Sequence, residues 1–352
     1  MKPELLLKPT PAGLYCPSGD FYIDPVRPVD RAVVTHGHSD HARAGHGVVL
    51  ATEPTLAIMA SRYGEAFTER RQAAAYGETV TINGVTIRLV PAGHILGSAQ
   101  AVVEKGGARV VVSGDYKRRR DPTCPRFEPV PCDIFISEAT FGLPVFRHPP
   151  DTEEIAKLLL SLKTFPERCH LVGAYSLGKA QRVICLLREA GHDAPIYLHG
   201  AMQKLCDLYT AHGVKLGDLR PAADAMKTPL TREVFKGAIV LCPPSSLNDL
   251  WSRKLGDVVT SFASGWMRVR ARARQRLVEL PLIISDHADW DELTATITEI
   301  KPGALWVTHG AEEALVHWSN SIGVPATALN LVGYDEDGEG EPAAPTPTEA
   351  SA

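Results

Sequence analysis

The stretch Ala32–Gly45, AVVTHGHSDHARAG, places three histidines and an aspartate within six residues, directly after an apolar run. These side chains are His36, His38, Asp40 and His41. Imidazole nitrogen and carboxylate oxygen are good ligands for borderline divalent metals such as zinc. One ion could not easily take four ligands from so short a loop. Two neighbouring ions could share them, and a pair of ions about 3.5–4 Å apart is the usual arrangement for phosphoester hydrolysis.

Three further candidate ligands stand just past apolar strands later in the chain. His94 lies in VPAGHILGSAQ, Asp115 in VVVSGDY and His309 in LWVTHG. Functional side chains are often carried on loops that a rigid sheet positions. The repeated placement of a polar side chain at the end of a strand therefore predicts that one edge of a sheet assembles a metal site.

Taken in order, these residues resemble the metallo-β-lactamase fold. The resemblance is carried by the HxHxDH stretch, the later lone His94 and the aspartate of SGD, and it covers about residues 12–334. It implies an α/β fold, an αββα sandwich. It also implies that Asp24, in FYID, orients the metal site from behind the ligands.

About 140 residues, 143–282, separate ISEAT from ISDHADW, and this long interval resembles the cap domain of the β-CASP nucleases. Glu138, His287 and His309 match three further motifs of that group. The expected organisation is a metallo-β-lactamase domain in two parts, 1–142 and 283–334, with an α/β β-CASP cap, 143–282, inserted between them. A disordered acidic tail, 335–352, is expected to follow.

The resemblance implies a role for each site residue. His287 would donate to the scissile phosphate or act as general acid, and Glu138 would hold its imidazole. Asp115 would bridge two divalent ions, with zinc favoured over manganese or iron, and a hydroxide between the ions would attack the phosphate. The ligands implied for the first ion are His36, His38 and His94. Those implied for the second ion are Asp40, His41 and His309.

The elements that must position these residues can be read from the pattern. Residues 21–140 are rich in β-branched runs separated by Gly, Pro and Asn, with an Asn-Gly and a Gly-Gly hairpin. One helix, TEPTLAIMASRYG, interrupts them. From about residue 150, helical periodicity alternates with short apolar strands, which predicts a βαβ layer with a parallel sheet.

Two short segments could hold a nucleic-acid backbone beside the metals. In YSLGKAQ, Ser176 and Lys179 lie where a strand becomes a helix, and free N–H groups at a helix start suit a phosphate. The alternative is an N-cap at Ser176 with a surface lysine. Lys117, in YKRRRDP, follows Asp115 closely and could meet incoming phosphates; a solvated turn is the alternative.

The segment MRVRARARQR repeats arginine at every second position. In a strand, all of these guanidinium groups would project from one face, where a polynucleotide backbone could neutralise them. Arg268, Arg270 and Arg272 are the candidate contacts. The alternative is a solvated edge strand whose charges prevent aggregation.

The composition limits the setting. The 352 residues are 44% hydrophobic, yet no apolar run is long enough to cross a membrane and no secretory signal is visible, so we expect a cytoplasmic protein. Seven cysteines without a CxxC pair predict free thiols. The net charge of −4 would be +2 without the six acidic residues of segment 334–352.

The sequence looks most like bacterial DNA-ligase-associated exonucleases, relatives of the mRNA 3′-end processing factors. This resemblance implies a DNA exonuclease (exodeoxyribonuclease) acting in DNA repair with an ATP-dependent DNA ligase and a helicase. His309 cuts against DNA, because a histidine at this motif is typical of RNA-processing members, so an RNA-processing nuclease is the alternative. A small-molecule hydrolase and an inactive scaffold are weaker readings.

Overall fold

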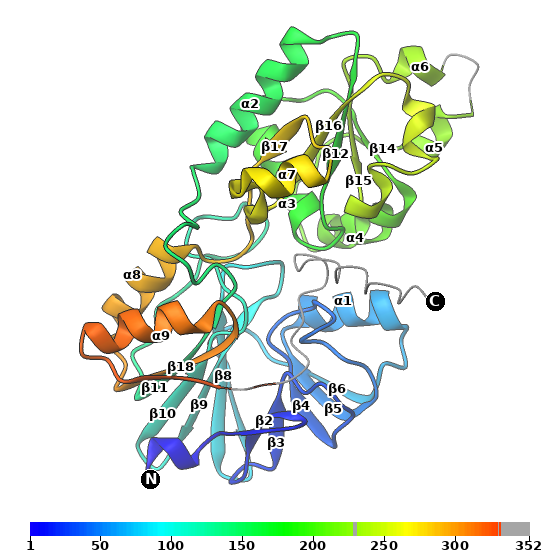
Figure 1. The fold of residues 1–352 in the computed structure, drawn as a ribbon. Helices are drawn as coiled ribbons and strands as arrows, with labels where there is room; N and C mark the ends of the chain where they lie inside the picture. Colours follow the sequence, from blue (N-terminus) through cyan, green and yellow to red (C-terminus); the bar gives the residue numbers. More distant parts are fainter. Residues whose placement is uncertain (228–230, 330, 332–352) are drawn as a thin grey trace, which may run out of the picture.

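Figure 1 shows a computed structural model of the chain, which describes residues 1–227, 231–329 and 331. Two β-sheets form the lower part in this view, and a third sheet lies above them. We call the lower part the sandwich unit and the upper part, residues 151–282, the cap unit. The predicted disordered tail, 335–352, lies outside the described residues.

The first sheet of the sandwich unit follows the order of the sequence. Its first three strands pair antiparallel, and the later pairs are parallel. The strands are β1 (Lys8–Thr10), β2 (Gly13–Cys16), β3 (Phe21–Ile23), β4 (Arg31–Val33), β5 (His46–Ala51) and β6 (Thr68–Ala73).

The second sheet of the sandwich unit has the order β19-β18-β11-β10-β9-β8-β7. Strands β7 to β10 form antiparallel hairpins, whereas β10, β11, β18 and β19 pair in parallel. The strands are β7 (Thr79–Ile82), β8 (Val85–Pro91), β9 (Ala99–Lys105), β10 (Ala108–Val112), β11 (Ile134–Ala139), β18 (Ala304–Gly310) and β19 (Ala326–Ala328).

The two sheets share a buried core, in which Ile23 and Leu50 of the first sheet pack with Val110 of the second. Helix α1 (Glu53–Tyr63) covers the outer face of the first sheet. Helices α8 (Trp290–Ile300) and α9 (Glu312–Ser321) cover the outer face of the second sheet. The layers are therefore helix, sheet, sheet and helix, and the predicted fold class is confirmed.

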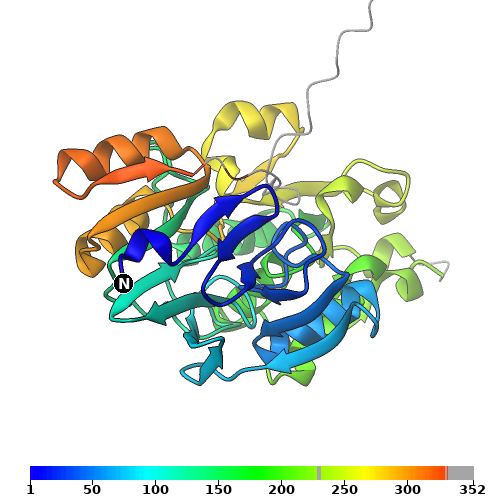
Figure 2. The same ribbon diagram turned by 90° about the horizontal axis from the view of Figure 1, so that it is seen from below.

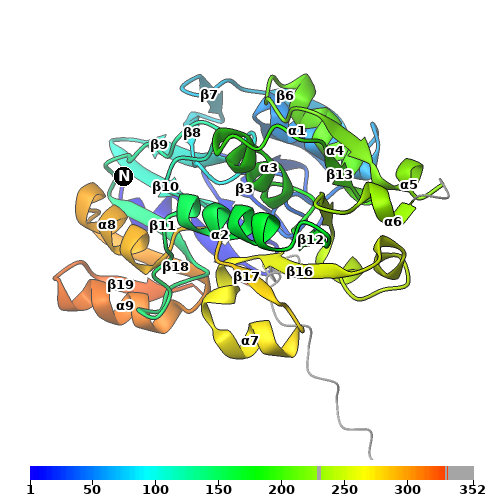
Figure 3. The same ribbon diagram turned by 90° about the horizontal axis from the view of Figure 1, so that it is seen from above.

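The cap unit contains a six-stranded sheet of order β14-β13-β15-β12-β16-β17, parallel in every pairing, as the alternating pattern predicts. Helices α2, α3 and α4 pack on one face of this sheet and α7 on the other (Figure 3). The strands are β12 (Cys169–Gly173), β13 (Ile196–Leu198), β14 (Leu219–Pro221), β15 (Ile239–Cys242), β16 (Val258–Ala263) and β17 (Leu280–Leu282).

The helices of the cap unit are α2 (Asp151–Thr164), α3 (Lys179–Glu189), α4 (Gly200–Ala211), α5 (Ala222–Ala225), α6 (Thr231–Val234) and α7 (Arg270–Gln275). Short 3-10 turns complete the described elements: Pro3–Leu5, Pro244–Ser246, Ser252–Leu255 and Gly265–Arg268. Among the described residues, no helix has both the length and the apolar character that a bilayer crossing requires.

Local sequence signals account for several boundaries. Helix α1 begins after Thr52, whose hydroxyl accepts from the Thr55 N–H, and it ends at Gly64. The predicted hairpins are present, with Asn83 and Gly84 at positive φ between β7 and β8. Gly106 lies in the β9–β10 turn, where its carbonyl accepts from the Met1 amino group at 2.9 Å. The start of the chain, marked N in Figure 2, therefore lies beside the second sheet.

The strand predicted for the arginine-rich segment is wrong. Residues Gly265–Arg268 form a 3-10 turn and α7 follows directly, so arginines at every second position point around a helix rather than along one face. Alanine, the strongest helix former, alternates with them, and Val269 is the one β-branched residue of the segment. Helix propensity therefore outweighs the period of two.

A buried ionic network joins the two units. Arg182, on α3, donates to Asp121 of the sandwich unit at 2.6 Å and also to Asp151 at the start of α2. The Arg182 side chain is completely buried. Removing one member of a buried ion pair leaves an unpaired charge in the protein interior, which is strongly destabilising. The network therefore fixes the cap unit against the sandwich unit.

Candidate metal centre

The HxHxDH loop leaves β4 and turns tightly above the sheet edge. The Ala42 N–H donates to the His38 carbonyl at 2.7 Å, so the loop closes as one helical turn. Gly37 faces α1, where a Cβ atom would meet Ile58 Cγ2 at 2.5 Å. A glycine is needed at this close approach. The turn directs the side chains on either side of Gly37 toward the second sheet.

The first group of candidate ligands comes from three separate loops. His36, His38, His94 and Asp115 each place one ligand atom within 4.8 Å of the others. His38 Nδ1 and His94 Nε2 are 3.0 Å apart, and His36 Nε2 lies 3.3 Å from Asp115 Oδ2. The resemblance implied the three histidines as ligands of the first ion and Asp115 as a bridge between the ions, and the structure brings all four together.

The second group lies on the other side of Asp115. His41 Nε2 is 3.5 Å from Asp115 Oδ1 and 3.4 Å from Asp40 Oδ2. His309, at the end of β18, places Nε2 3.1 Å from the same Oδ1 atom. The two oxygens of Asp115 thus face different groups, the geometry that a bridging carboxylate requires.

Each of the five histidines has its second ring nitrogen held by a neighbour. Asp24 lies 2.8 Å from His41 Nδ1 and also accepts from the Thr35 N–H and hydroxyl. This arrangement fixes the ring orientation and leaves the opposite nitrogen toward the centre. The other four contacts join His36 to Thr35, His38 to Leu177, His94 to Asp286 and His309 to Thr308.

Burial and charge divide the histidines by protonation. Burial lowers the pKa of His36 and His94 well below the usual value, so both rings are neutral and able to coordinate. Burial also acts on His41, but the carboxylates of Asp115, Asp40 and Asp24 outweigh it and raise the pKa of His41 to about 10. A cation would have to displace that proton.

The donor set fits divalent cations. His36 Nε2 and Asp40 Oδ1 are both buried, and neither has a hydrogen-bond partner among the described residues. Buried polar atoms without partners are costly. Nitrogen and carboxylate oxygen donors that converge from several loops suit zinc, manganese or iron. Each group could therefore hold one cation.

His287 and Glu138 form a pair beside the first group. Glu138 Oε2 lies 3.0 Å from His287 Nδ1, and its Oε1 accepts from the Tyr116 N–H at 2.7 Å. Asp115, Glu138 and His287 also meet the geometric requirement for a third ligand group. The carboxylate nonetheless occupies Nδ1, so it holds the ring in one orientation.

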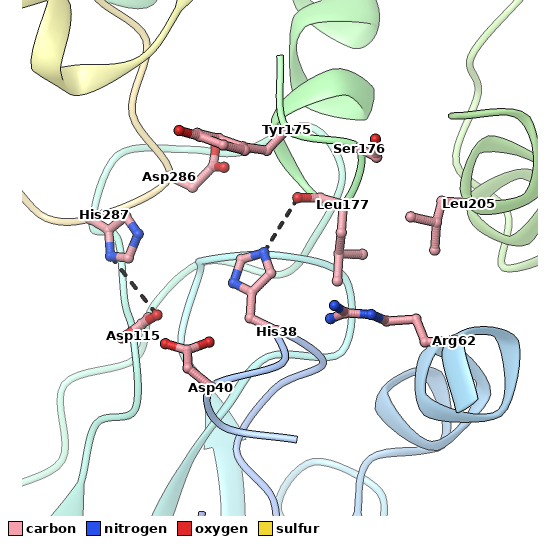
Figure 4. A pocket seen from close by; sticks show the side chains of 10 residues that line it. All are labelled: His38, Asp40, Arg62, Asp115, Tyr175, Ser176, Leu177, Leu205, Asp286 and His287. Carbon is pink, nitrogen blue, oxygen red and sulfur yellow. Dashed lines mark hydrogen bonds and ion pairs between the residues drawn. The ribbon is translucent and has the colours of Figure 1, made fainter. Parts of the chain in front are cut away.

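A pocket of about 260 Å³ opens over both groups, between the sandwich and cap units (Figure 4). The sequence-predicted residues on its wall are His38, Asp40, Asp115, Ser176 and His287. Its other wall residues, which the sequence did not single out, are Arg62, Tyr175, Leu177, Leu205 and Asp286.

Arg62 is a positively charged side chain on the pocket wall that the sequence analysis did not identify. It projects from the end of α1 toward His38, and its guanidinium donates to the Gly37 carbonyl at 2.7 Å. A lone arginine in the last turn of a helix is usually a favourable partner of the helix dipole. Nothing local to the sequence therefore distinguished it.

The two lysines predicted to meet phosphates are buried instead. Lys117 donates to the Ser285 carbonyl, and Lys179 lies 3.2 Å from Asp286 Oδ2. Their relative exposures are 1% and 0%. Neither faces solvent, so the alternatives of a solvated turn at Lys117 and a surface lysine at Lys179 were wrong, and contact with a phosphate stays a prediction. The alternative role of Ser176 as an N-cap was also wrong, because Gly178 takes that position.

One arginine of α7 stacks on an aromatic ring near the site. The Arg272 guanidinium lies 4.0 Å from the ring centroid of Trp266, which packs against Phe141 at 4.9 Å. Phe141 in turn lies 6.2 Å from His287, measured between ring centroids. No carboxylate of the described residues forms an ion pair with Arg268, Arg270, Arg272, Arg274 or Arg276.

Comparison with known proteins agrees with this geometry. The metallo-beta-lactamase superfamily model matches residues 23–170. A probable DNA ligase of Opitutus terrae is 29% identical over 328 residues, which are 90% of this chain and 30% of that protein.

Two other relatives have names linked to RNA processing. Cleavage and polyadenylation specificity factor subunit 3 of Dictyostelium discoideum is 29% identical, over 86% of this chain and 49% of that protein. Endoribonuclease YSH1 of Mycosarcoma maydis is 27% identical, over 51% of this chain and 25% of that protein. The chain thus spans a quarter to a half of these three relatives. Residues 23–170 therefore match a metallo-β-lactamase domain, and the last two relatives are β-CASP nucleases of this superfamily.

Proposed function

We propose that this chain is a metal-dependent phosphodiesterase that degrades DNA from its ends, as an exonuclease in cytoplasmic DNA repair. One observation carries the proposal. Two groups of candidate metal ligands and the Glu138–His287 pair converge on a single pocket. Two adjacent cations at such a site would neutralise a phosphate and lower the pKa of a water molecule, and zinc is the cation that we favour.

The side chains divide the remaining work. His287 faces the pocket, where it donates a hydrogen bond to the scissile phosphate or a proton to the leaving oxygen. Glu138 holds that imidazole from behind through Nδ1. Asp40 and Asp115 would hold the cations through their carboxylate oxygens. Asp24 keeps His41 turned toward them.

The polynucleotide backbone needs contacts on both sides of the cut. Ser176 and Arg62 line the pocket and can each donate to a phosphate oxygen. Arg268, Arg270 and Arg272 form a second positive region beside Trp266 and have no carboxylate partner among the described residues. Unpaired arginines favour a polyanion, and their contribution would weaken as salt rises.

The breadth of one match supports DNA as the substrate. Ninety per cent of this chain aligns with a protein named as a probable DNA ligase. A nuclease that trims ends beside a ligase would prepare them for joining, so we propose an ATP-dependent DNA ligase and a helicase as functional partners. Residues 143–282 would be the cap domain that confines the strand over the metals.

RNA is the second candidate substrate. One relative is named as an endoribonuclease and another as a cleavage and polyadenylation factor. His309, which lies 3.1 Å from Asp115, is also the residue type typical of RNA-processing members of the group.

A nuclease assay tests both substrates. The protein is incubated with end-labelled single- and double-stranded DNA and RNA, with Mn²⁺ or Zn²⁺, and with EDTA. We expect metal-dependent shortening of DNA from an end. Asp40→Ala should abolish it, and the same change at exposed Asp30 should not. Degradation of RNA alone would favour the second candidate. Intact nucleic acid under every condition would refute the proposal.

A further inference from the structure

Two histidines of the first group are oriented by carbonyl groups from outside the sandwich sheets. His38 Nε2 lies 3.3 Å from the Leu177 carbonyl oxygen, and His94 Nδ1 lies 3.0 Å from the Asp286 carbonyl oxygen. A carbonyl can only accept, so each of these nitrogens carries the proton. The unprotonated nitrogens are then His38 Nδ1 and His94 Nε2, the pair that faces the metal site.

The two carbonyl groups belong to the cap unit and to the segment that leaves it. Leu177 lies in the loop between β12 and α3, and Asp286 follows β17. The second group is held differently, since Asp24 and Thr308 of the sandwich unit contact His41 and His309. The orientation of His38 and His94 therefore depends on the cap unit and on the segment that leaves it, whereas the contacts described for the second group come from the sandwich unit.

Lys179 links the two carbonyl-bearing segments. Its Nζ lies 3.2 Å from Asp286 Oδ2, and both side chains are almost completely buried. Gly178, next to it, has φ 87° and packs so closely that a Cβ atom would meet Ile95 Cγ2 at 2.4 Å. Ile95 directly follows His94 in sequence, so the cap loop rests on the loop that carries this ligand.

We propose that the cap unit completes the first metal site, and that Lys179 is a positioning residue for that site rather than a phosphate ligand. Its ammonium group anchors Asp286, whose carbonyl holds His94, and it keeps the Leu177 carbonyl over His38. The affinity of the first cation thus depends on the cap, and the second cation binds without it. This inference rests on the proposed two-cation site but not on the substrate.

Zinc binding to the complete chain tests the inference without any nuclease activity. Zn²⁺ is titrated in competition with a chromophoric chelator, with far-ultraviolet circular dichroism as the check on folding. We expect the wild type to bind two equivalents. Lys179→Met should weaken one of them about 10- to 100-fold and leave the other unchanged, as loss of an outer contact does at other metal sites. Lys179→Arg should restore most of the affinity.

Lys204→Met is the matched control for the lysine. Lys204 also joins the two units, because its ammonium group donates to the Ser61 carbonyl on α1, but among the described contacts it does not anchor either carbonyl that orients His38 or His94. Its replacement should leave both zinc affinities unchanged. An equal effect of Lys204→Met and Lys179→Met would refute the specific role of Lys179.

A pair of glycine substitutions tests the same inference by another route, and it decides the matter if Lys179→Met does not fold. Gly178→Ala forces the cap loop away from Ile95, whereas Gly191→Ala, at φ 83°, meets nothing within 4 Å. Both strain the backbone, but only Gly178→Ala should weaken the first zinc. Two wild-type zinc affinities in folded Lys179→Met or Gly178→Ala would overturn the inference. A wild type that binds no zinc would overturn the two-cation proposal itself.

Discussion

Asp24→Asn should weaken binding of the second cation. Asp24 has φ 44°, a conformation that asparagine tolerates, so the fold should survive. If the new amide nitrogen replaces Oδ2, it donates to His41 Nδ1 and moves the ring proton to Nε2, the atom that faces Asp115. In the wild type, Asp24 Oδ1 accepts from the Thr35 N–H at 2.8 Å. In the reverse orientation, the amide nitrogen would take the place of Oδ1, and two hydrogen-bond donors would face each other. Neither orientation satisfies both neighbours.

The expected loss of affinity is about 10- to 100-fold, or roughly 1.4–2.7 kcal/mol, which is the usual cost of removing a partner behind a metal ligand. The assay measures activity against metal concentration after chelation. The midpoint should rise by that factor, while activity at saturating metal changes little. Asp20→Asn is the control, because Asp20 also has positive φ, 52°, but lies at the surface beside Tyr15. An unchanged midpoint for Asp24→Asn would refute the role of this carboxylate.

Three further outcomes are expected. His287→Asn should lower the turnover rate about 10²- to 10⁴-fold with unchanged metal content, whereas the loss of one bound ion by elemental analysis would make His287 a ligand. Arg182→Met should lower the free energy of unfolding by about 3–5 kcal/mol in urea titrations. Arg220→Met, which removes the exposed pair of Arg220 with Asp218, should leave the unfolding midpoint nearly unchanged. Metal uptake at about pH 8 should release a proton from His41, because its pKa of about 10 keeps it protonated without a cation, and calorimetric heats that do not vary with buffer ionisation enthalpy would contradict this.

The sandwich could be predicted because its signals are local. The β-branched runs, the Asn-Gly turn and the Thr52 cap each lie within a few residues of the element that they define. The proximity of His94 and Asp115 also followed from one rule, since each stands just past a strand of the second sheet. His36 follows β4 of the first sheet, so the site lies between the edges of two sheets rather than at the single edge that the sequence predicted.

Prediction from the sequence failed for side chains whose contact partners lie far away in the chain. Lys117 lies in an ordinary basic turn, and only the fold brings it to Ser285, 168 positions later. Lys179 meets Asp286 for the same reason. The arginine segment failed differently, because a period of two in charge was given more weight than the helix propensity of the alanines between the charges.

The buried position of Arg182 limits how relatives of this protein could diversify. The guanidinium reaches Asp121 in one unit and Asp151 in the other. If this cap were joined to the sandwich unit of another protein, the buried Arg182 guanidinium would lose Asp121, one of its two counter-ions. Recombination between relatives should therefore succeed only when both proteins have an acidic residue at the position of Asp121 and an arginine at the position of Arg182. An exchange of caps should otherwise require matched substitutions in both units.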